Sequence, residues 1–283
     1  MKDLIKKILK EETEEIFVIP GLHYFPDEID GLKNFIQKKN IKRWSLDDKL
    51  DFREYKDDLT WVEGLVSISG FLDFEGKQIE SLPNLHSVGG YLDIRYTLIE
   101  SLDNLQSVGS FLHLKGTEIE SLPKLQYVGD RLDIRGTPIK DLTNLQSVGG
   151  SLDLERTTIK DLPNLQSVGS YLDIRGTQIK SLPKLQSVDG YINLMYSSIE
   201  SLPNLQSVGS YLDLERTKIR SLPNLQSVGG YLDLRGTQIE SLESLPNLQS
   251  VGGNLFLNKY IFKKYTGEEI RIGINVDGDI IRP

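Results

Sequence analysis

The chain has 283 residues, a formal net charge of −8 and no cysteine. The acidic charge argues against a protein that neutralises nucleic-acid phosphates. The lack of cysteine excludes disulfides, thiolate metal sites and a cysteine nucleophile. The first 15 residues contain no uninterrupted apolar run, and no stretch approaches the roughly 18 apolar residues of a membrane span. We therefore expect a cytoplasmic protein without a secretory signal peptide, which binds neither nucleic acid nor membrane.

Residues 1–61 are highly charged and do not repeat. Apolar residues near helical spacing predict one helix within residues 1–17 and another over 27–39, and residues 17–19 before a Pro-Gly pair favour a short strand. We expect residues 1–61 to form a mixed α/β cap, because repeat arrays need a polar cover on their open ends. A separate catalytic domain is the alternative, but nothing in the segment has catalytic spacing.

From residue 62 to residue 241 the chain repeats every 20 residues, and a tenth turn, lengthened by three residues, follows to residue 258. One turn reads L-P-x-L-x-x-V-G-x-x-L-x-L-x-x-T-x-I-x-x. In YLDIR, Leu172 and Ile174 alternate with polar neighbours, which predicts a strand with one buried face. A glycine-rich corner precedes this strand, and we expect its glycines to supply backbone angles that other residues avoid.

Stacked turns of this kind form parallel sheets with strands about 4.8 Å apart, so that ten turns make a rod roughly 45–50 Å long. Twenty residues leave no room for a full helix on the return side of each turn. The predicted fold is a mostly β repeat solenoid, a right-handed leucine-rich-repeat or β-helix-like coil of about ten turns. It would occupy residues 62–258, between the N-terminal cap and a C-terminal β cap at 259–283, where alternating polarity favours one or two strands.

Two known families resemble this repeat. LPNLQSVGGYLDLRGTQIES, residues 222–241, resembles the 20-residue leucine-rich repeats of bacterial secreted effectors, with the same LP opening and L-x-L strand. Those repeats carry an asparagine after the strand, where this chain has threonine, whose hydroxyl can bond to the adjacent backbone and is expected to turn inward. The NLQSVGGYLDI portion resembles the L domains of the insulin and epidermal growth factor receptors, which are right-handed β-helices that contain cysteines. Both resemblances imply the architecture more specifically than the function.

The outward positions of the L-x-L strand form three columns along one sheet. The aromatic column contains Phe71, Tyr91, Phe111, Arg131, Ser151, Tyr171, Tyr191, Tyr211 and Tyr231. The carboxylate column contains Asp73, Asp93, His113, Asp133, Asp153, Asp173, Asn193, Asp213 and Asp233. The arginine column contains Glu75, Arg95, Lys115, Arg135, Glu155, Arg175, Met195, Glu215 and Arg235. In leucine-rich-repeat proteins, the corresponding face is concave and carries the ligand.

Exposed tyrosines beside arginines suggest a binding surface, because both residue types are enriched in interface hot spots. The alternative is that stacked tyrosines only shield the sheet and stabilise one another. We expect binding to concentrate on the four consecutive aromatic turns 171–231. The candidate binding residues are Tyr91, Asp93, Arg95, Tyr171, Asp173, Arg175, Tyr191, Tyr211, Asp213, Tyr231, Asp233 and Arg235.

The carboxylate column has two interpretations. Stacked carboxylates resemble a cation site, since Ca²⁺ takes six to eight oxygen ligands. Basic residues lie two positions further along several of the same strands, so a network of Asp–Arg pairs is the simpler interpretation. Where Arg becomes Glu, at Glu155 and Glu215, the next residue becomes Arg156 or Arg216 in place of glycine. The positive charge is thereby kept and moved one place, which supports pairing.

No catalytic motif accompanies the repeat: the nucleophile-elbow, P-loop and zincin patterns are all missing from the sequence. We therefore expect a non-enzymatic, monomeric recognition scaffold that binds a protein or peptide and uses no cofactor or metal. A glycan-binding module is the second hypothesis, because tyrosines with carboxylates also suit sugars. An effector or anti-defence protein of a bacterium or phage, acting by binding, is the third.

Overall fold

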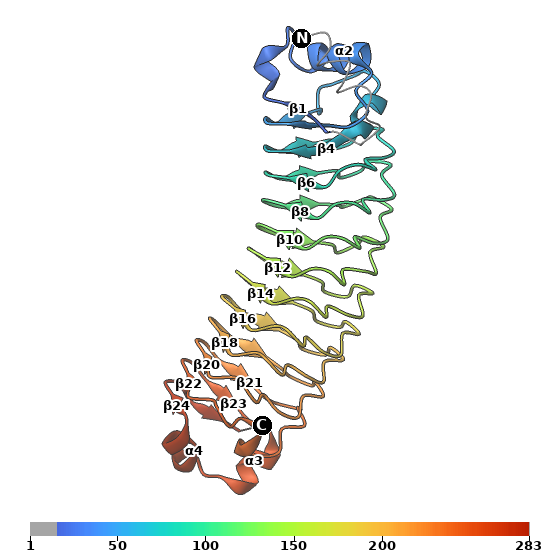
Figure 1. Ribbon diagram of the computed structural model, residues 1–283. Helices are drawn as coiled ribbons and strands as arrows, with labels where there is room; N and C mark the ends of the chain where they lie inside the picture. Colours follow the sequence, from blue (N-terminus) through green and yellow to red (C-terminus); the bar gives the residue numbers. More distant parts are fainter. Residues whose placement is uncertain (1–15, 283) are drawn as a thin grey trace.

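The computed structural model describes residues 16–282 as a rod of stacked turns, with the N-terminal segment at one tip and the C-terminal segment at the other (Figure 1). The rod is a mostly β parallel solenoid of about eleven turns, which confirms the predicted fold class. Each turn contributes two short strands on either side of the glycine-rich corner, and the rest of the turn is an irregular return path. Between residues 16 and 282, none of the helices has the length and apolar character needed to cross a lipid bilayer.

Two parallel sheets run the length of the rod, one on each side of the corner. The first has 13 strands, in the order β1 (Phe17–Ile19), β2 (Trp44–Leu46), β4 (Leu65–Ile68), β6 (Ser87–Val88), β8 (Ser107–Val108), β10 (Tyr127–Val128), β12 (Ser147–Val148), β14 (Ser167–Val168), β16 (Ser187–Val188), β18 (Ser207–Val208), β20 (Ser227–Val228), β22 (Ser250–Val251) and β24 (Asn275–Val276).

The second sheet has 12 strands, which follow the L-x-L motif. They are β3 (Leu50–Asp51), β5 (Leu72–Asp73), β7 (Leu92–Asp93), β9 (Leu112–His113), β11 (Leu132–Asp133), β13 (Leu152–Asp153), β15 (Leu172–Asp173), β17 (Ile192–Asn193), β19 (Leu212–Asp213), β21 (Leu232–Asp233), β23 (Leu255–Phe256) and β25 (Ile280–Ile281). Within the regular turns each residue pairs with its equivalent 20 positions away, as Leu152 does with Leu172.

The core is a continuous apolar column inside the coil, to which every side of a turn contributes. In one turn the fully or almost fully buried side chains are Leu172, Ile174, Ile179, Leu182, Leu185 and Val188, all of which the sequence predicted to face inward. Thr177 is also buried, and its hydroxyl donates to the carbonyl of Ile174 at 2.8 Å. The threonines therefore turn inward and close the bend after the strand, as expected.

The corner glycines are required for a different reason than the one predicted. They do not adopt positive φ angles. Instead, a Cβ added to Gly109 would lie 1.9 Å from the carbonyl oxygen of Gly89, one turn below. Glycine is therefore needed because neighbouring turns approach closely. Asp189 occupies one such corner. The hydrogen bond from its amide to the carbonyl of Val168 is 3.1 Å long, which is longer than the 2.8 Å of the equivalent bond from Gly109 to Val88.

The return side is held by an asparagine ladder that bridges consecutive turns. The side-chain amide of Asn204 donates to the carbonyl of Pro183 at 2.6 Å, and that of Asn224 to Pro203 at 2.7 Å. Equivalent bonds recur along much of the rod. No full helix forms in the return path of the regular turns; the three extra residues of the tenth turn form a short 3₁₀ helix, η3 (Leu242–Ser244).

The N-terminal segment contains β1, η1 (Leu22–Tyr24), α2 (Ile29–Lys39) and η2 (Thr60–Gly64). The strand at 17–19 and the second helix are confirmed, whereas the helix expected within residues 1–17 lies outside the described residues, except for its last two positions. β2 and β3 pair with β4 and β5, so both sheets continue into this segment. The rings of Phe52 and Phe74 stack at 4.6 Å across the join.

The C-terminal segment also joins both sheets, because β24 pairs with β22 and β25 with β23. These are the two strands that its alternating polarity predicts. Two short helices that the sequence interpretation missed, α3 (Lys259–Lys264) and α4 (Gly267–Gly273), lie between β23 and β24. The second begins with a capping box, in which Thr266 and Glu269 bond reciprocally to each other's backbone amides.

Candidate functional site

The three predicted columns lie side by side on the outer surface of the second sheet, because each short strand alternates its side chains between the core and the outside. We call this surface, formed by the aromatic, carboxylate and arginine columns, the Tyr/Asp/Arg face. Regular backbone hydrogen bonds between adjacent strands keep the side chains of each column evenly spaced. The amide of Leu172 donates to the carbonyl of Tyr191, and the amide of Ile192 donates to the carbonyl of Tyr211, each at 2.9 Å. All twelve predicted binding residues belong to this face.

The aromatic column forms two stacks separated by the turns that carry Arg131 and Ser151. The first stack contains Phe71, Tyr91 and Phe111, with centroids 4.6 and 4.7 Å apart. The second stack contains Tyr171, Tyr191, Tyr211 and Tyr231, with separations of 4.8, 4.5 and 4.7 Å and nearly parallel rings. The rings are half-buried because each ring covers the face of its neighbour, which is the stacking that the sequence analysis gave as its alternative.

Burial also affects the ionisation of the tyrosines. It raises the pKa of Tyr191 to about 12, with a further contribution from the neighbouring phenols of Tyr211 and Tyr171. Burial likewise raises the pKa of Tyr231 to about 12, and the carboxylates of Asp213 and Asp233 add to the effect. The hydroxyls of Tyr191 and Tyr231 therefore stay protonated, and available as hydrogen-bond donors, to a higher pH than an exposed phenol.

The aspartates lie beneath this surface. Those at positions 73, 93, 153, 173, 213 and 233 are only 2–5% exposed. One oxygen of each accepts from the amide two residues further on, as Asp93 Oδ1 does from Arg95 at 3.1 Å and Asp173 Oδ1 from Arg175 at 3.1 Å. This side-chain turn holds the bend after the strand. The predicted binding residues Asp93, Asp173, Asp213 and Asp233 are thus mainly structural supports for the face.

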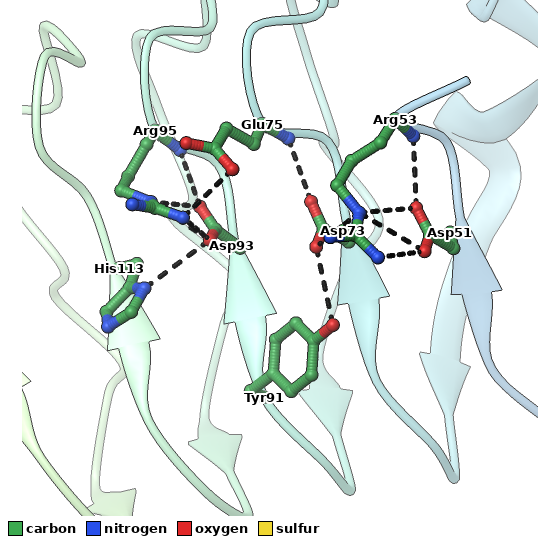
Figure 2. Close-up of polar contacts among 8 residues, drawn as sticks. All are labelled: Asp51, Arg53, Asp73, Glu75, Tyr91, Asp93, Arg95 and His113. Carbon is green, nitrogen blue, oxygen red and sulfur yellow. Dashed lines mark hydrogen bonds and ion pairs between the residues drawn. The ribbon is translucent and has the colours of Figure 1, made fainter. Parts of the chain in front are cut away.

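Arginines clamp several of these carboxylates from the solvent side (Figure 2). Arg95 reaches Asp93 Oδ2 with its Nη2 at 2.6 Å and extends to Glu75 of the previous turn at 3.0 Å. Burial raises the pKa of Asp93, but the bonds from the side chain and amide of Arg95 outweigh it and hold that pKa below its usual range. Arg175 and Asp173 pair at 2.7 Å. The predicted Asp–Arg network is confirmed.

The two turns with glutamate in the arginine column behave differently. Arg156 and Arg216 approach Glu155 and Glu215, at 3.6 and 3.5 Å, and not the aspartate of their own turn. The displaced charge is therefore paired, but with a different partner from the one expected. Asp213 therefore has no arginine bonded to it within its own turn. Burial raises the pKa of Asp213, and the hydrogen bond from the amide of Glu215 does not offset this increase.

A fourth column, directly after the arginine column, contains residues that the sequence interpretation did not single out as binding residues. Five turns have glycine there, with φ between +67° and +77°. Four turns place a large residue in the same left-handed conformation, with φ of 56–58°, and we call these the corner residues: Tyr96, Arg156, Tyr196 and Arg216. Tyr196 is 55% exposed. The sequence contains a signal for these corner residues, because each of them stands in a column that is otherwise mainly glycine.

Tyr196 and Arg216 lie in adjacent turns and contact each other. The guanidinium of Arg216 lies 5.2 Å from the centroid of the Tyr196 ring, and its Nη1 donates to the phenol oxygen at 2.9 Å. The turn of Tyr196 also has Asn193 and Met195 in place of the usual aspartate and arginine. The second aromatic stack therefore contains a turn without charge in the carboxylate and arginine columns, and the corner residue of this turn, Tyr196, pairs with Arg216 of the next turn.

Within the described residues, no three His, Asp or Glu side chains gather in an arrangement that would hold a metal ion. Of the histidines, His113 occupies the carboxylate column and places Nδ1 3.4 Å from Asp93 Oδ2 (Figure 2). Comparisons with protein-family models, with curated proteins and with solved structures gave no significant match, so the function has to be inferred from the geometry of this face.

Proposed function

We propose that the chain is a leucine-rich-repeat recognition scaffold, without catalytic activity, that binds a protein or peptide along the second aromatic stack and the adjacent corner residues. The observation that carries the proposal is the pair Tyr196 and Arg216, two large side chains held in a left-handed backbone conformation on the surface. Such a conformation is uncommon for residues other than glycine, asparagine and aspartate.

The fold does not need these side chains. Glycine fills the equivalent position in five other turns, where the strand, the bend and the buried threonine or its replacement are arranged in the same way. A non-glycine residue in the left-handed region costs roughly 1–2 kcal/mol. Strain of this kind tends to persist where it serves a function. Contact with a partner would explain why a tyrosine and an arginine occupy exposed corners.

The composition around the pair fits a binding patch. Tyrosine and arginine are enriched in interface hot spots, which cluster in contiguous patches that lose their water on binding. Met195 is half-buried beside the stack, and the carboxylate and arginine columns of its turn, Asn193 and Met195, carry no charge. We expect a peptide with an aromatic or aliphatic anchor near Met195 and a carboxylate within reach of Arg216.

Stacking of the tyrosines argues against the glycan-binding alternative. A sugar that binds by stacking needs an uncovered aromatic face, but the rings of Tyr191 and Tyr211 each have a neighbouring ring on both faces, at 4.5–4.8 Å. The ring of Tyr231 meets the edge of Phe256 on its remaining side. The protein or peptide hypothesis is therefore the better supported of the two.

The test restores glycine at the two corners. A displayed peptide library selected on the wild-type protein supplies ligands, and fluorescence anisotropy measures their affinity. The double variant Tyr196→Gly/Arg216→Gly should bind about 30-fold more weakly, equivalent to about 2 kcal/mol. Its melting temperature should stay unchanged or rise, because glycine relieves the backbone strain.

Arg156→Gly is the matched control, since it makes the same change at a corner that lies outside the second aromatic stack. It should leave peptide affinity unchanged. Selection that enriches no peptide, or peptides that bind the double variant as tightly as the wild type, would show that this surface is not the binding site.

A further inference from the structure

The break between the two aromatic stacks is itself a structured feature. After Phe111 the column continues with Arg131 and Ser151, so no ring covers the sheet around β11. A notch of about 490 Å³ opens at this place, between the turns of β7 and β11. At this place the bond from the amide of Leu112 to the carbonyl of Arg131 measures 3.2 Å, against 2.9 Å for the bond from the amide of Leu132 to the carbonyl of Ser151 in the next turn.

Basic side chains line this notch. They are Arg95, Lys115, Arg131 and Arg135, with His113 and Asp133 between them. In a chain of net charge −8 this is an unusual concentration of positive charge. It includes the longest run of consecutive basic residues in the arginine column, at positions 95, 115 and 135. Figure 2 shows two of these residues, Arg95 and His113, which both contact the Asp93 carboxylate.

Part of this charge is already neutralised, and part is not. Arg95 and Arg135 are engaged with Asp93 and Asp133, at 2.6 and 2.7 Å. Lys115 has no carboxylate within 4.0 Å among the described residues and only approaches the ring of Tyr96, at 6.0 Å. A ligand can therefore still gain charge-assisted hydrogen bonds here.

Arg131 supplies the second observation. Its Nη2 pairs with Asp133 at 2.8 Å, whereas its Nε is buried and has no hydrogen-bond partner in the described structure. Buried donors without a partner are rare and call for an explanation, such as an ion that satisfies them. Arg131 also interrupts a column that is otherwise mainly aromatic, so the first stack ends at Phe111.

We propose that this notch is an anion-binding site, which takes a phosphate-type oxyanion or a carboxylate between Lys115 and Arg131, with Arg95 at its rim. An arginine fork presents parallel N–H donors to such oxyanions, and the lysine adds a point charge. The site does not depend on the peptide surface proposed above, since it lies on the other side of the turn that carries Ser151. Either proposal can fail without the other.

The experiment follows the side-chain Nε–H signals of arginine by NMR during titration with inorganic phosphate, and separately with acetate, at constant ionic strength. We expect a saturable shift of the Arg131 signal. Lys115→Gln, which leaves that signal observable, should weaken phosphate binding at least about tenfold. A tighter response to phosphate than to acetate identifies a phosphate-type ligand, and the reverse order identifies a carboxylate.

Arg131→Tyr restores the aromatic residue typical of the column and should abolish saturable binding, measured by calorimetry, in a protein that remains folded. Arg220→Gln is the charge-matched control, because Arg220 lies in another part of the turn and bonds to Gln238 at 2.8 Å. It should bind phosphate like the wild type. Shifts that rise linearly with either salt, or equal losses in Lys115→Gln and Arg220→Gln, would overturn the proposal.

Discussion

Replacing aspartate by asparagine should have opposite effects on stability at two positions of the same column. Asp93 and Asp213 are both buried, and each accepts the amide two residues further on. Asn193 occupies an equivalent position and keeps this bond, to the amide of Met195 at 3.2 Å. The substitutions Asp93→Asn and Asp213→Asn should therefore preserve the bend and change mainly the charge.

At Asp93 the charge is stabilising. The carboxylate accepts from Nε and Nη2 of Arg95 at 2.9 and 2.6 Å. Hydrogen bonds to charged groups contribute about 1.5–3 kcal/mol each, so Asp93→Asn should lower the free energy of unfolding by about 2–3 kcal/mol at neutral pH. At Asp213 the residue two positions on is Glu215, and no arginine of the same turn compensates the buried charge. Asp213→Asn should raise stability by about 0.5–1 kcal/mol.

The pH dependence follows from the pKa directions. The lowered pKa of Asp93 means that its contribution is present above the unfolded pKa of about 4 and is lost as the pH falls through the folded value. The raised pKa of Asp213 means that its penalty is absent below the unfolded pKa of about 4, grows as the pH rises above that value and is complete once the pH exceeds the folded value. Both differences from the wild type should therefore shrink in acid.

Urea unfolding followed by circular dichroism, at neutral pH and at about pH 3.5, measures these effects through the transition midpoints. Arg95→Met provides an independent comparison, because it leaves the Asp93 carboxylate buried without its clamp and should destabilise the protein at neutral pH. Equal signs for the two asparagine variants would refute the idea that the arginine in the same turn decides whether a buried aspartate stabilises the coil.

Two further predictions concern the coil itself. Leu172→Ala should lower the free energy of unfolding by about 2–5 kcal/mol, because the side chain of Leu172 fills the core, and Tyr171→Ala should lower it by much less. Thermal melts that rank the two variants in the reverse order would mean that the faces of the strand are misassigned. Gly109→Ala should lower the free energy of unfolding by about 1–3 kcal/mol, because the added Cβ would contact the turn below. Gly136 has open space around it but a φ of +70°, so Gly136→Ala should lower the free energy of unfolding by about 1–2 kcal/mol through backbone strain alone. Only the Gly109 variant should speed amide hydrogen exchange in the adjacent turn.

The architecture was predictable because the signal is repeated. Alternation around Leu172 predicts the strand, and the 20-residue period predicts the register in which Leu152 pairs with Leu172. The sequence also indicates that the solenoid begins before residue 62. Residues 50–53, Leu-Asp-Phe-Arg, already contain the strand motif, and the first two of them form β3. There the repeat is less obvious because the surrounding residues do not follow the period.

The surface was less predictable, because burial depends on side chains one turn away. Alternation places Asp173 outside the core, but it cannot show that Arg175 and neighbouring tyrosines cover it. For the same reason it cannot distinguish exposed tyrosines from stacked ones. The corner residues required a comparison along the column, where Tyr196 stands in place of glycine, and their left-handed conformation is visible only in the structure.

The constant register has a consequence for how the molecule can change length. Adjacent turns present equivalent strand partners, such as Ser167 and Ser187 or Val168 and Val188, so adding or deleting one whole turn leaves the joints intact. The extra three residues of the tenth turn are likewise absorbed in η3, without disturbing the pairing of Ser227 with Ser250. Each added turn would lengthen the rod by about 4.8 Å. The distance between the notch at Arg131 and the second aromatic stack can therefore change during evolution only in steps of one whole turn.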